Sequence, residues 1–340
     1  MKQLAIPAAL PSSIAALDRA LGPGGASALD PSVPSALWRR ALAGPAAEFL
    51  ARPGKELRSM IVRAGWALGG GTPEAMPDRL PLVLELLHAG SLIVDDVEDD
   101  SDERRGAPTL HRLFGVPLAI NTGSWMYFWA LAELGALGLP PATELAMHRI
   151  AIATLVCCHQ GQALDLATRI GDLDVVYASS VVETITRLKT GALCKLAAEL
   201  GAIAAGAAPA RREAVGRFAE TMGIALQMLD DLGSLASPAR RDKGREDLRA
   251  GRSTWPWAWL AERDPFAWSR LTGMARGVAA GDGDADALGD ALVGIVGPIG
   301  RDRVSATLAR ALTELTAAVG PSPMIDMITA ELRRMEESYG

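Results

Sequence analysis

Cysteine and clustered positive charge are both scarce in this sequence of 340 residues. The 3 cysteines, Cys157, Cys158 and Cys194, have no metal-ligand spacing, and an odd number argues against a disulfide framework. We interpret them as core residues of a protein from a reducing compartment, which favours the cytoplasm. The formal net charge is −6 and the basic residues are scattered along the chain. No nucleic-acid partner is therefore expected.

Long apolar runs are missing as well. No uninterrupted apolar stretch reaches about 18 residues, so we expect no transmembrane segment. The nearest candidate, 115–138, contains Asn121 and Glu133 and is better interpreted as a buried helix. The N-terminus has one lysine and an apolar stretch that prolines interrupt, which makes it a poor secretory signal.

Strand-like alternation is rare, and helical periodicity dominates from Pro34 onward. We predict an all-α protein with one helical domain over 34–340. Residues 1–33, rich in Ala, Pro, Gly and Ser, are expected to form a loose leader with one short helix near 12–21. The Gly/Asp-rich run 279–286 predicts a surface loop. The main helices are expected at about 55–68, 78–100, 117–137, 141–169, 174–206, 210–236, 252–263, 284–296, 301–319 and 323–338.

The stretch Glu85–Arg105, ELLHAGSLIVDDVEDDSDERR, begins apolar and ends in acids followed by two arginines. In a helix, Asp95 and Asp99 lie one turn apart on the same face, with Asp96 beside them. Carboxylates this close repel one another, and Mg²⁺ commonly bridges one or two carboxylates to substrate phosphates. Arginines supply forked donors for the remaining phosphate oxygens. For one such cluster taken alone, a solvated acidic surface is the alternative.

A second stretch, LQMLDDLGSLASPARRDKGREDLRAGRSTWP at Leu226–Pro256, has the same order. An apolar, helix-like run ends in Asp230 and Asp231, and basic residues follow. Two acid pairs at the ends of apolar helices, each followed by cations, suit a metal–diphosphate site built between facing helices of a bundle. The repeated pattern favours this interpretation over a solvated surface.

These motifs resemble a known family. DDVEDDSDERRG resembles the first aspartate-rich motif of the trans-prenyltransferases, the isoprenyl diphosphate synthases, and QMLDDLGS resembles their second. The resemblance covers about residues 35–335 and is greatest to the geranylgeranyl diphosphate synthases of the eukaryotic type. It implies an isoprenoid-synthase bundle around a central cavity and a homodimer. Further matches, in the family's order, are GKELR at 54–58, His88, KTGAL at 189–193, Gln227 and DLRAGRSTWP at 247–256.

The resemblance also implies a mechanism. Two or three Mg²⁺ ions would bind Asp95, Asp99 and Asp230, with Asp96 as a further ligand or outer-shell partner. They would hold the diphosphate of an allylic substrate and stabilise the pyrophosphate that leaves. Isopentenyl diphosphate would attack the allylic cation, and a proton would then be lost, with pyrophosphate as the expected base.

Substrate-binding residues follow from the same resemblance. Arg104 would contact the allylic diphosphate and Arg105 the isopentenyl diphosphate; surface salt bridges with neighbouring acids are the alternative for this pair. The isopentenyl pocket would also contain Lys55, Arg58 and His88, although a lone histidine on an apolar face can be a core group. The residues expected near the second motif are Lys189 and Thr190, which would point at the allylic diphosphate, and Gln227, Lys243 and Arg252.

Four positions depart from the family's pattern: Glu56, Ser124, Ser234 and Arg252, which takes the place of a usual lysine. Glu56 replaces the usual second basic residue of the GKRxR motif. Ser234 replaces the last aspartate of the second motif, which makes a metal shell built from all three positions unfavourable; eukaryotic-type synthases also lack that aspartate. Ser124 stands where many relatives have aspartate.

Product length depends on the floor of the apolar pocket. One turn before Asp95, Gly90 and Ser91 occupy positions where short-chain farnesyl synthases tend to carry aromatic rings. Small residues there predict an open pocket and a C20 product. Leu87 lies deeper, and Tyr127 and Phe128 on the next helix are candidates to close the pocket, with plain core packing as the alternative.

The leading hypothesis is therefore Mg²⁺-dependent, head-to-tail condensation of isopentenyl diphosphate with an allylic diphosphate to give geranylgeranyl diphosphate. The alternative product is farnesyl diphosphate. A class I terpene cyclase would hold one diphosphate only and would have no use for Lys55, Arg58, His88 and Arg105. A non-catalytic partner subunit would be expected to lose its metal ligands, which this sequence retains.

Overall fold

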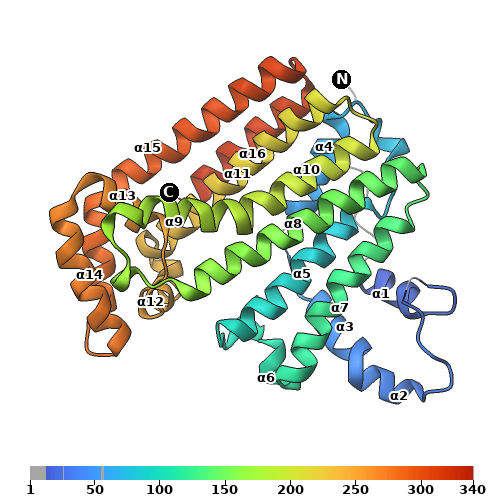
Figure 1. The fold of residues 1–340 in the computed structure, drawn as a ribbon, viewed down its shortest axis with the longest axis horizontal. Helices are drawn as coiled ribbons and strands as arrows, with labels where there is room; N and C mark the ends of the chain where they lie inside the picture. Colours follow the sequence, from blue (N-terminus) through green and yellow to red (C-terminus); the bar gives the residue numbers. More distant parts are fainter. Residues whose placement is uncertain (1–12, 26, 55–56, 340) are drawn as a thin grey trace. The chain divides into compact units, whose positions relative to one another are not determined.

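The computed structural model describes residues 13–25, 27–54 and 57–339. This part of the chain is almost entirely helical, which confirms the predicted all-α class (Figure 1). Its exception is one antiparallel hairpin of β1 (Glu103–Arg104) and β2 (Ala107–Pro108). The contacts divide the chain into two compact units: residues 1–151 with 197–208, and residues 152–196 with 209–340. The expected boundary at residue 33 stays a prediction.

The first unit begins with α1 (Ser13–Leu21), a helix that the sequence predicts near 12–21. Its buried side chains, Ala16, Leu17 and Ala20, form one face, and it contacts α3. The elements that follow are α2 (Ser35–Trp38), a π-helical turn η1 (Arg39–Ala43), α3 (Gly44–Leu50), α4 (Leu57–Leu68), η2 (Pro73–Ala75), α5 (Leu80–Glu98), α6 (Leu110–Phe114), α7 (Val116–Gly135) and the first part of α8 (Pro141–Ala167).

The core of this unit is the contact between α5 and α7, which run beside each other in Figure 1. Glycine lets the two backbones approach closely. A Cβ atom on Gly90 would lie 2.7 Å from the carbonyl oxygen of Gly123. Fully buried apolar side chains then fill the contact. They are Leu82, Leu84, Leu86, Leu87 and Ile93 from α5, with Met126 and Trp129 from α7.

The second unit is organised around α11 and α15, which are in extensive contact and lie side by side in Figure 1. Trp257 and Trp259 of α13 are fully buried beside them. The elements of this unit are η3 (Ile170–Asp172), α9 (Val175–Thr186), a π-helical turn η4 (Arg187–Gly191), the start of α10 (Ala192–Ala204), α11 (Pro209–Ala236), η5 (Pro238–Arg240), α12 (Arg241–Arg249), α13 (Trp255–Arg263), α14 (Pro265–Ala280), α15 (Ala285–Val319) and α16 (Pro323–Tyr339).

The expected break between helices 284–296 and 301–319 is wrong, because α15 is continuous through Pro298. A proline removes one backbone hydrogen bond and crowds the carbonyl four residues earlier, here that of Gly294. Both residues are exposed, so water can reach that carbonyl. The opposite face of α15 stays buried at helical spacing, with Leu292, Val296 and Val304 along it. Packing therefore overrides the local break signal.

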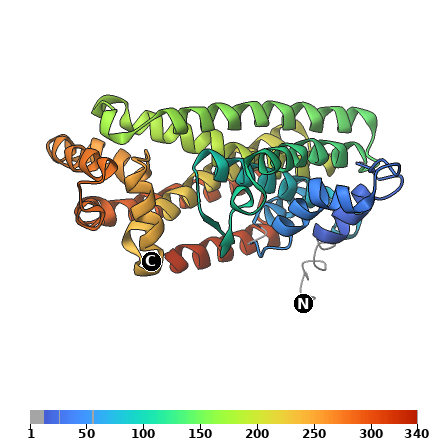
Figure 2. The same cartoon turned by 90° about the horizontal axis from the view of Figure 1, so that it is seen from below.

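Helix α8 is continuous over its 27 residues (Figure 2). Among the described helices it is the one that is long and apolar enough to cross a membrane, judged by length and composition, and 11% of its most apolar window is buried. Such a helix is weak evidence for a membrane span, since core helices of soluble proteins pass the same test. The predicted absence of a transmembrane segment is therefore not confirmed.

Candidate functional site

The first aspartate cluster lies where α5 ends. Asp95 and Asp96 are in its last turns, and Asp99 is the C-cap residue, whose N–H donates to the Asp95 carbonyl at 2.9 Å. The carboxyl end of a helix carries partial negative charge, so acids there raise the local negative potential further. The position therefore favours cations, as the motif predicts.

One of these cations comes from the chain itself. Arg104 donates from Nε and Nη2 to Oδ1 of Asp96, at 2.8 and 2.5 Å. Asp96 is 1% exposed, and its Oδ2 has no hydrogen-bond partner among the described residues. Burial raises the pKa of Asp96, and the bond from Arg104 offsets only part of this effect. Arg104 thus faces the acidic cluster and is paired with Asp96; its expected contact with the allylic diphosphate stays a prediction.

The second arginine of the motif lies in a cationic cluster. Burial lowers the pKa of Arg105; Glu85 opposes this, whereas Arg104 and Arg58 add to it. Burial also lowers the pKa of His88 well below its ordinary value, and Arg58 and Arg105 lower it further. His88 is therefore neutral near pH 7. Three arginines and a neutral histidine influence one another here, and such a cationic cluster favours a polyanion.

Arg58 fits the same description. It enters the cluster from α4, and its Nε is buried without a hydrogen-bond partner among the described residues. Lys55, the other predicted member of this pocket, lies outside the described residues. Next to it in the sequence, Gly54 borders Arg105: a Cβ at residue 54 would lie 3.3 Å from Nη1 of Arg105. Gly54, the first residue of the GKELR segment, is thus beside the second arginine of the first motif.

The structure shows how the predicted chain-length positions are packed. Gly90 does not leave an open pocket, because the backbone of α7 occupies the space that its side chain would fill. Phe128 is 71% exposed, so in a single chain it cannot close a buried pocket. Ser91 is half-buried, and its hydroxyl donates to the His88 carbonyl at 2.9 Å. Tyr127 does border α5, since its Cδ1 would lie 3.4 Å from a Cβ on residue 90.

In the second unit, the KTG segment forms the π-helical turn η4 between α9 and α10. Such turns inside helices occur often at functional sites. The helix expected over 174–206 is interrupted here by this turn. Lys189 of this turn pairs with Asp165 of α8, with Nζ 2.6 Å from Oδ2. Arg252 reaches the same oxygen at 3.3 Å. Asp165 therefore holds two of the predicted diphosphate-binding cations together.

The two carboxylates of the second aspartate motif, Asp230 and Asp231, have different partners. Asp231 accepts from Gln227 Nε2 at 2.8 Å and from the Trp255 N–H at 3.0 Å, while Thr190 donates to Gln227 Oε1 at 3.2 Å. Burial raises the pKa of Asp231 to about 7, against these two hydrogen bonds. Both of its oxygens are therefore engaged within the chain.

Asp230 is bound on both oxygens by cations. Arg240 Nη2 lies 2.5 Å from Oδ1, and the Lys243 ammonium donates to Oδ2. Burial opposes ionisation of Asp230, but Lys243 and Arg240 outweigh it, so its pKa lies below the ordinary range. Asp247, four residues after Lys243, has its pKa raised to about 6 by burial, and Lys243 and Arg252 limit that rise.

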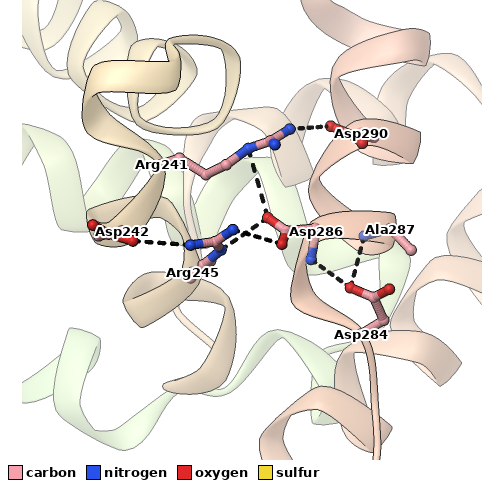
Figure 3. A network of polar contacts seen from close by, with 7 residues as sticks. All are labelled: Arg241, Asp242, Arg245, Asp284, Asp286, Ala287 and Asp290. Atoms are coloured by element: carbon pink, nitrogen blue, oxygen red, sulfur yellow. Dashed lines mark hydrogen bonds and ion pairs between the residues drawn. The ribbon is translucent and has the colours of Figure 1, made fainter.

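Lys243 is carried by α12, which ion pairs attach to α15 (Figure 3). Arg245 forms a two-pronged contact with Asp286, at 2.9 Å from Nε and 2.7 Å from Nη2. Arg241 Nη2 donates to Asp290 at 2.9 Å. On the other side, α12 lies directly against α11, since a Cβ on Gly244 would lie 2.3 Å from the Ser234 carbonyl. We call the four charged residues Arg241, Arg245, Asp286 and Asp290 the α12 network.

Several members of these clusters were not predicted as site residues: Arg52, Glu85, Arg240 and Asp247. Arg240 belongs to the basic run after the second motif, and that run is the one signal that could have indicated it. Arg52 and Glu85 are brought in by residues distant in sequence, whereas Asp247 is the first residue of the DLRAGRSTWP segment.

A family model for polyprenyl synthetases matches residues 39–276. The chain belongs to the polyprenyl synthetase family. Among its relatives, geranylgeranyl pyrophosphate synthase 2 of Zymoseptoria tritici is 34% identical over 219 residues, which cover 63% of this chain and 63% of that protein. A geranylgeranyl pyrophosphate synthase of Apiospora sacchari is 32% identical over 243 residues, 70% of this chain and 69% of that protein. The aligned part thus spans less than two thirds of the Zymoseptoria relative.

Solved polyprenyl synthetase structures share the fold. The geranylgeranyl pyrophosphate synthetase of Pyrococcus horikoshii superposes with a TM-score of 0.73 at 22% identity, covering 89% of this chain and 91% of that one. The heptaprenyl diphosphate synthase of Staphylococcus aureus gives 0.72 at 19% identity, covering 87% and 91%. These two proteins are named for products of different length, so the shared fold does not by itself set product length.

Proposed function

We propose that this polyprenyl synthetase condenses isopentenyl diphosphate head-to-tail with an allylic prenyl diphosphate and releases geranylgeranyl diphosphate. The observation that carries the proposal is the cationic cluster of Arg58, Arg104 and Arg105 around a neutral His88. Such a cluster calls for a bound polyanion, and it lies next to a separate acidic cluster at the end of α5. An enzyme that ionises a single diphosphate has no need for this second phosphate pocket.

The acidic cluster has the donor chemistry for a hard divalent cation, and we propose Mg²⁺. Asp95 and Asp99 would hold it, and a buried oxygen of Asp96 has no hydrogen-bond partner among the described residues. Within those residues no group of three or more His, Cys, Asp or Glu side chains could hold a metal alone. Water and substrate phosphates would complete the shell. When bound, the ion would neutralise charge that develops on the leaving pyrophosphate.

The chain's own side chains would bind and orient the two substrates. Arg105, Arg58 and Lys55 are proposed for isopentenyl diphosphate, and Arg104 for the allylic one. In the second unit, Lys189, Thr190, Gln227, Lys243 and Arg252 are proposed for the allylic diphosphate, with Asp230 as the further metal ligand. In the present arrangement Asp165 and Asp230 already bind Lys189, Arg252 and Lys243. An arriving diphosphate or cation would therefore replace these internal ion pairs.

We further propose a homodimer. Three large apolar side chains of α7 are exposed at helical spacing: Val116, Ile120 and Phe128. Helix α8 exposes Leu145, Ile152 and Val156 in the same manner. The two helices are linked by the His148 ring, whose Nε2 is 3.1 Å from the Leu131 carbonyl. A second copy of the chain would remove this apolar surface from water.

The test is to incubate the purified protein and Mg²⁺ with labelled isopentenyl diphosphate and each of dimethylallyl, geranyl and farnesyl diphosphate. The products are dephosphorylated and separated as alcohols. A C20 alcohol supports the proposal in full. A C15 alcohol would support the proposed condensation but would show that the product is farnesyl diphosphate. No elongation with any starter, with Mn²⁺ tried as well, would overturn the proposal and favour a cyclase or a non-catalytic subunit.

A further inference from the structure

The hairpin that presents Arg104 and Arg105 is short and has an unusual turn. The register pairs Arg104 with Ala107, which leaves Arg105 and Gly106 as a two-residue turn with φ of +55° and +77°. Positive φ at both positions suits a tight hairpin turn, but a side chain other than glycine is strained there. An isolated two-stranded hairpin is marginally stable in water. Something outside the hairpin must hold Arg105 in this conformation.

Arg52, two residues after α3, contacts both strands of the hairpin. Its Nη1 donates to the Arg104 carbonyl at 2.9 Å, and its Nη2 donates to the Pro108 carbonyl at 2.6 Å. These carbonyls lie on opposite sides of the turn. The Arg52 side chain is 5% exposed, so water does not compete for these bonds.

Two residues of α3 hold Arg52 in turn. Both carboxylate oxygens of Glu48 accept from Nη2 of Arg52, at 2.9 and 2.8 Å. The guanidinium of Arg52 lies 5.4 Å from the centroid of the buried Phe49 ring, and the guanidinium of Arg105 lies 5.7 Å from the same centroid. Cations within about 6 Å of an aromatic ring are attracted to its face. The same short helix therefore fixes the backbone of the hairpin and the side chain at its turn.

We propose that Arg52 is a positioning residue for the diphosphate pocket: by bridging the Arg104 and Pro108 carbonyls it holds the strained turn, so that Arg105 faces the anion. Arg52 does not itself touch substrate, because its donors are used by the hairpin and by Glu48. The identity of the anion as isopentenyl diphosphate rests on the proposed function. The positioning itself rests on the contacts alone.

The test compares full-length wild type with Arg52→Met, Arg52→Lys and Arg112→Met. Arg112 is the matched control, because it binds Asp100 and Asp102 just before the hairpin but is 41% exposed. The probe is inorganic pyrophosphate, and the readout is the imidazole NMR signal of His88, which reports on this cluster. We expect Arg52→Met to weaken binding by about tenfold or more, and Arg112→Met to stay within about twofold. The Michaelis constant for isopentenyl diphosphate should rise in parallel, with a smaller change in kcat.

Arg52→Lys should fall between wild type and Arg52→Met, since one ammonium cannot reproduce the forked contact with two carbonyls. If Arg52→Met does not fold, Arg52→Lys alone tests the positioning role of Arg52. Wild-type pyrophosphate affinity in a folded Arg52→Met or Arg52→Lys protein would overturn the proposal, as would an equal loss in Arg112→Met. If wild type elongates no prenyl diphosphate, the proposed function fails, but the pyrophosphate titration still tests Arg52.

Discussion

A neutral imidazole among arginines is a sensitive probe of what binds beside it. Burial first, and then Arg58 and Arg105, hold the pKa of His88 well below the ordinary value of 6.5. A bound diphosphate reverses the sign of the local field and favours the imidazolium. We therefore expect inorganic pyrophosphate to raise the pKa of His88. NMR titration of the 4 histidines, with His88→Gln to assign the signal, measures this. An unchanged pKa under saturating pyrophosphate would place the anion elsewhere.

The same lowered pKa affects stability. The unfolded chain binds a proton at this histidine more readily than the folded chain does. The free energy of unfolding is therefore highest above the unfolded pKa of His88 and decreases as the pH falls below it. By pH 5.5, with His88 neutral in the folded chain, the free energy of unfolding has decreased by about 1.4 kcal/mol. Urea unfolding from pH 7.5 to 5.5 should show a flatter profile for His88→Gln than for wild type. Identical slopes would contradict this expectation.

Gly90 is predicted to act through packing rather than through product length. A Cβ there would lie 2.7 Å from the Gly123 carbonyl, which is a rigid backbone atom. Gly90→Ala should therefore lower the free energy of unfolding by about 1–3 kcal/mol, the usual cost of overpacking. Ser91→Ala, next along the helix, removes only a bond to a carbonyl of its own helix and should stay within about 0.5 kcal/mol. Denaturant unfolding of both variants distinguishes the two positions.

At residue scale, what the sequence could predict was local. Asp95 and Asp99 share a face because of helical spacing, and Asp230 and Asp231 belong to a motif of neighbours. The contact of Arg52 with Arg104 spans 52 positions, and no periodicity relates them. Spacing alone also does not say which face of α7 is covered, and Phe128 lies on an exposed one.

At the scale of elements, α12 is the helix that positions Lys243. The α12 network attaches it to α15 through exposed ion pairs, which salt screens (Figure 3). We expect Arg245→Met and Asp286→Asn each to speed amide hydrogen exchange in α12. The double variant should exchange no faster than Asp286→Asn, because that substitution alone already removes the pairs of Asp286 with Arg245 and Arg241.

High salt is the second arm of this experiment. In wild type it should speed exchange in α12, whereas in the double variant the further effect should be smaller, because of these ion pairs only that of Arg241 with Asp290 remains. Arg334→Met, which breaks an exposed ion pair on α16, is the matched control and should leave α12 unchanged. Exchange in α12 that is independent of both substitutions and salt would show that packing of Gly244 and Leu248 holds the helix alone.

Element boundaries were predictable where local signals agreed with packing. Helix α5 and helix α11 end close to their expected positions, and the interruption at Gly191 is the π-helical turn. The prediction failed at Pro298, where an exposed proline left the buried face of α15 intact. It also missed α12 and α14. Helix α14 does have local start and stop signals, with Asp264 accepting from the Phe266 and Ala267 N–H groups and Gly281 at φ +87°.

At the scale of the whole molecule, the exposed apolar side chains of α7 and α8 concern assembly. A glutamate in the middle of an apolar interface loses hydration without gaining a partner, which disfavours association. Phe128→Glu should therefore convert the proposed homodimer to monomer in sedimentation velocity, with the helical circular dichroism spectrum retained. Phe266→Glu is the control, since Phe266 is 93% exposed at the start of α14. A wild-type protein that is monomeric, or dimers that survive Phe128→Glu, would mean that α7 does not form the interface; dimers lost equally in both variants would mean that added charge alone causes the loss.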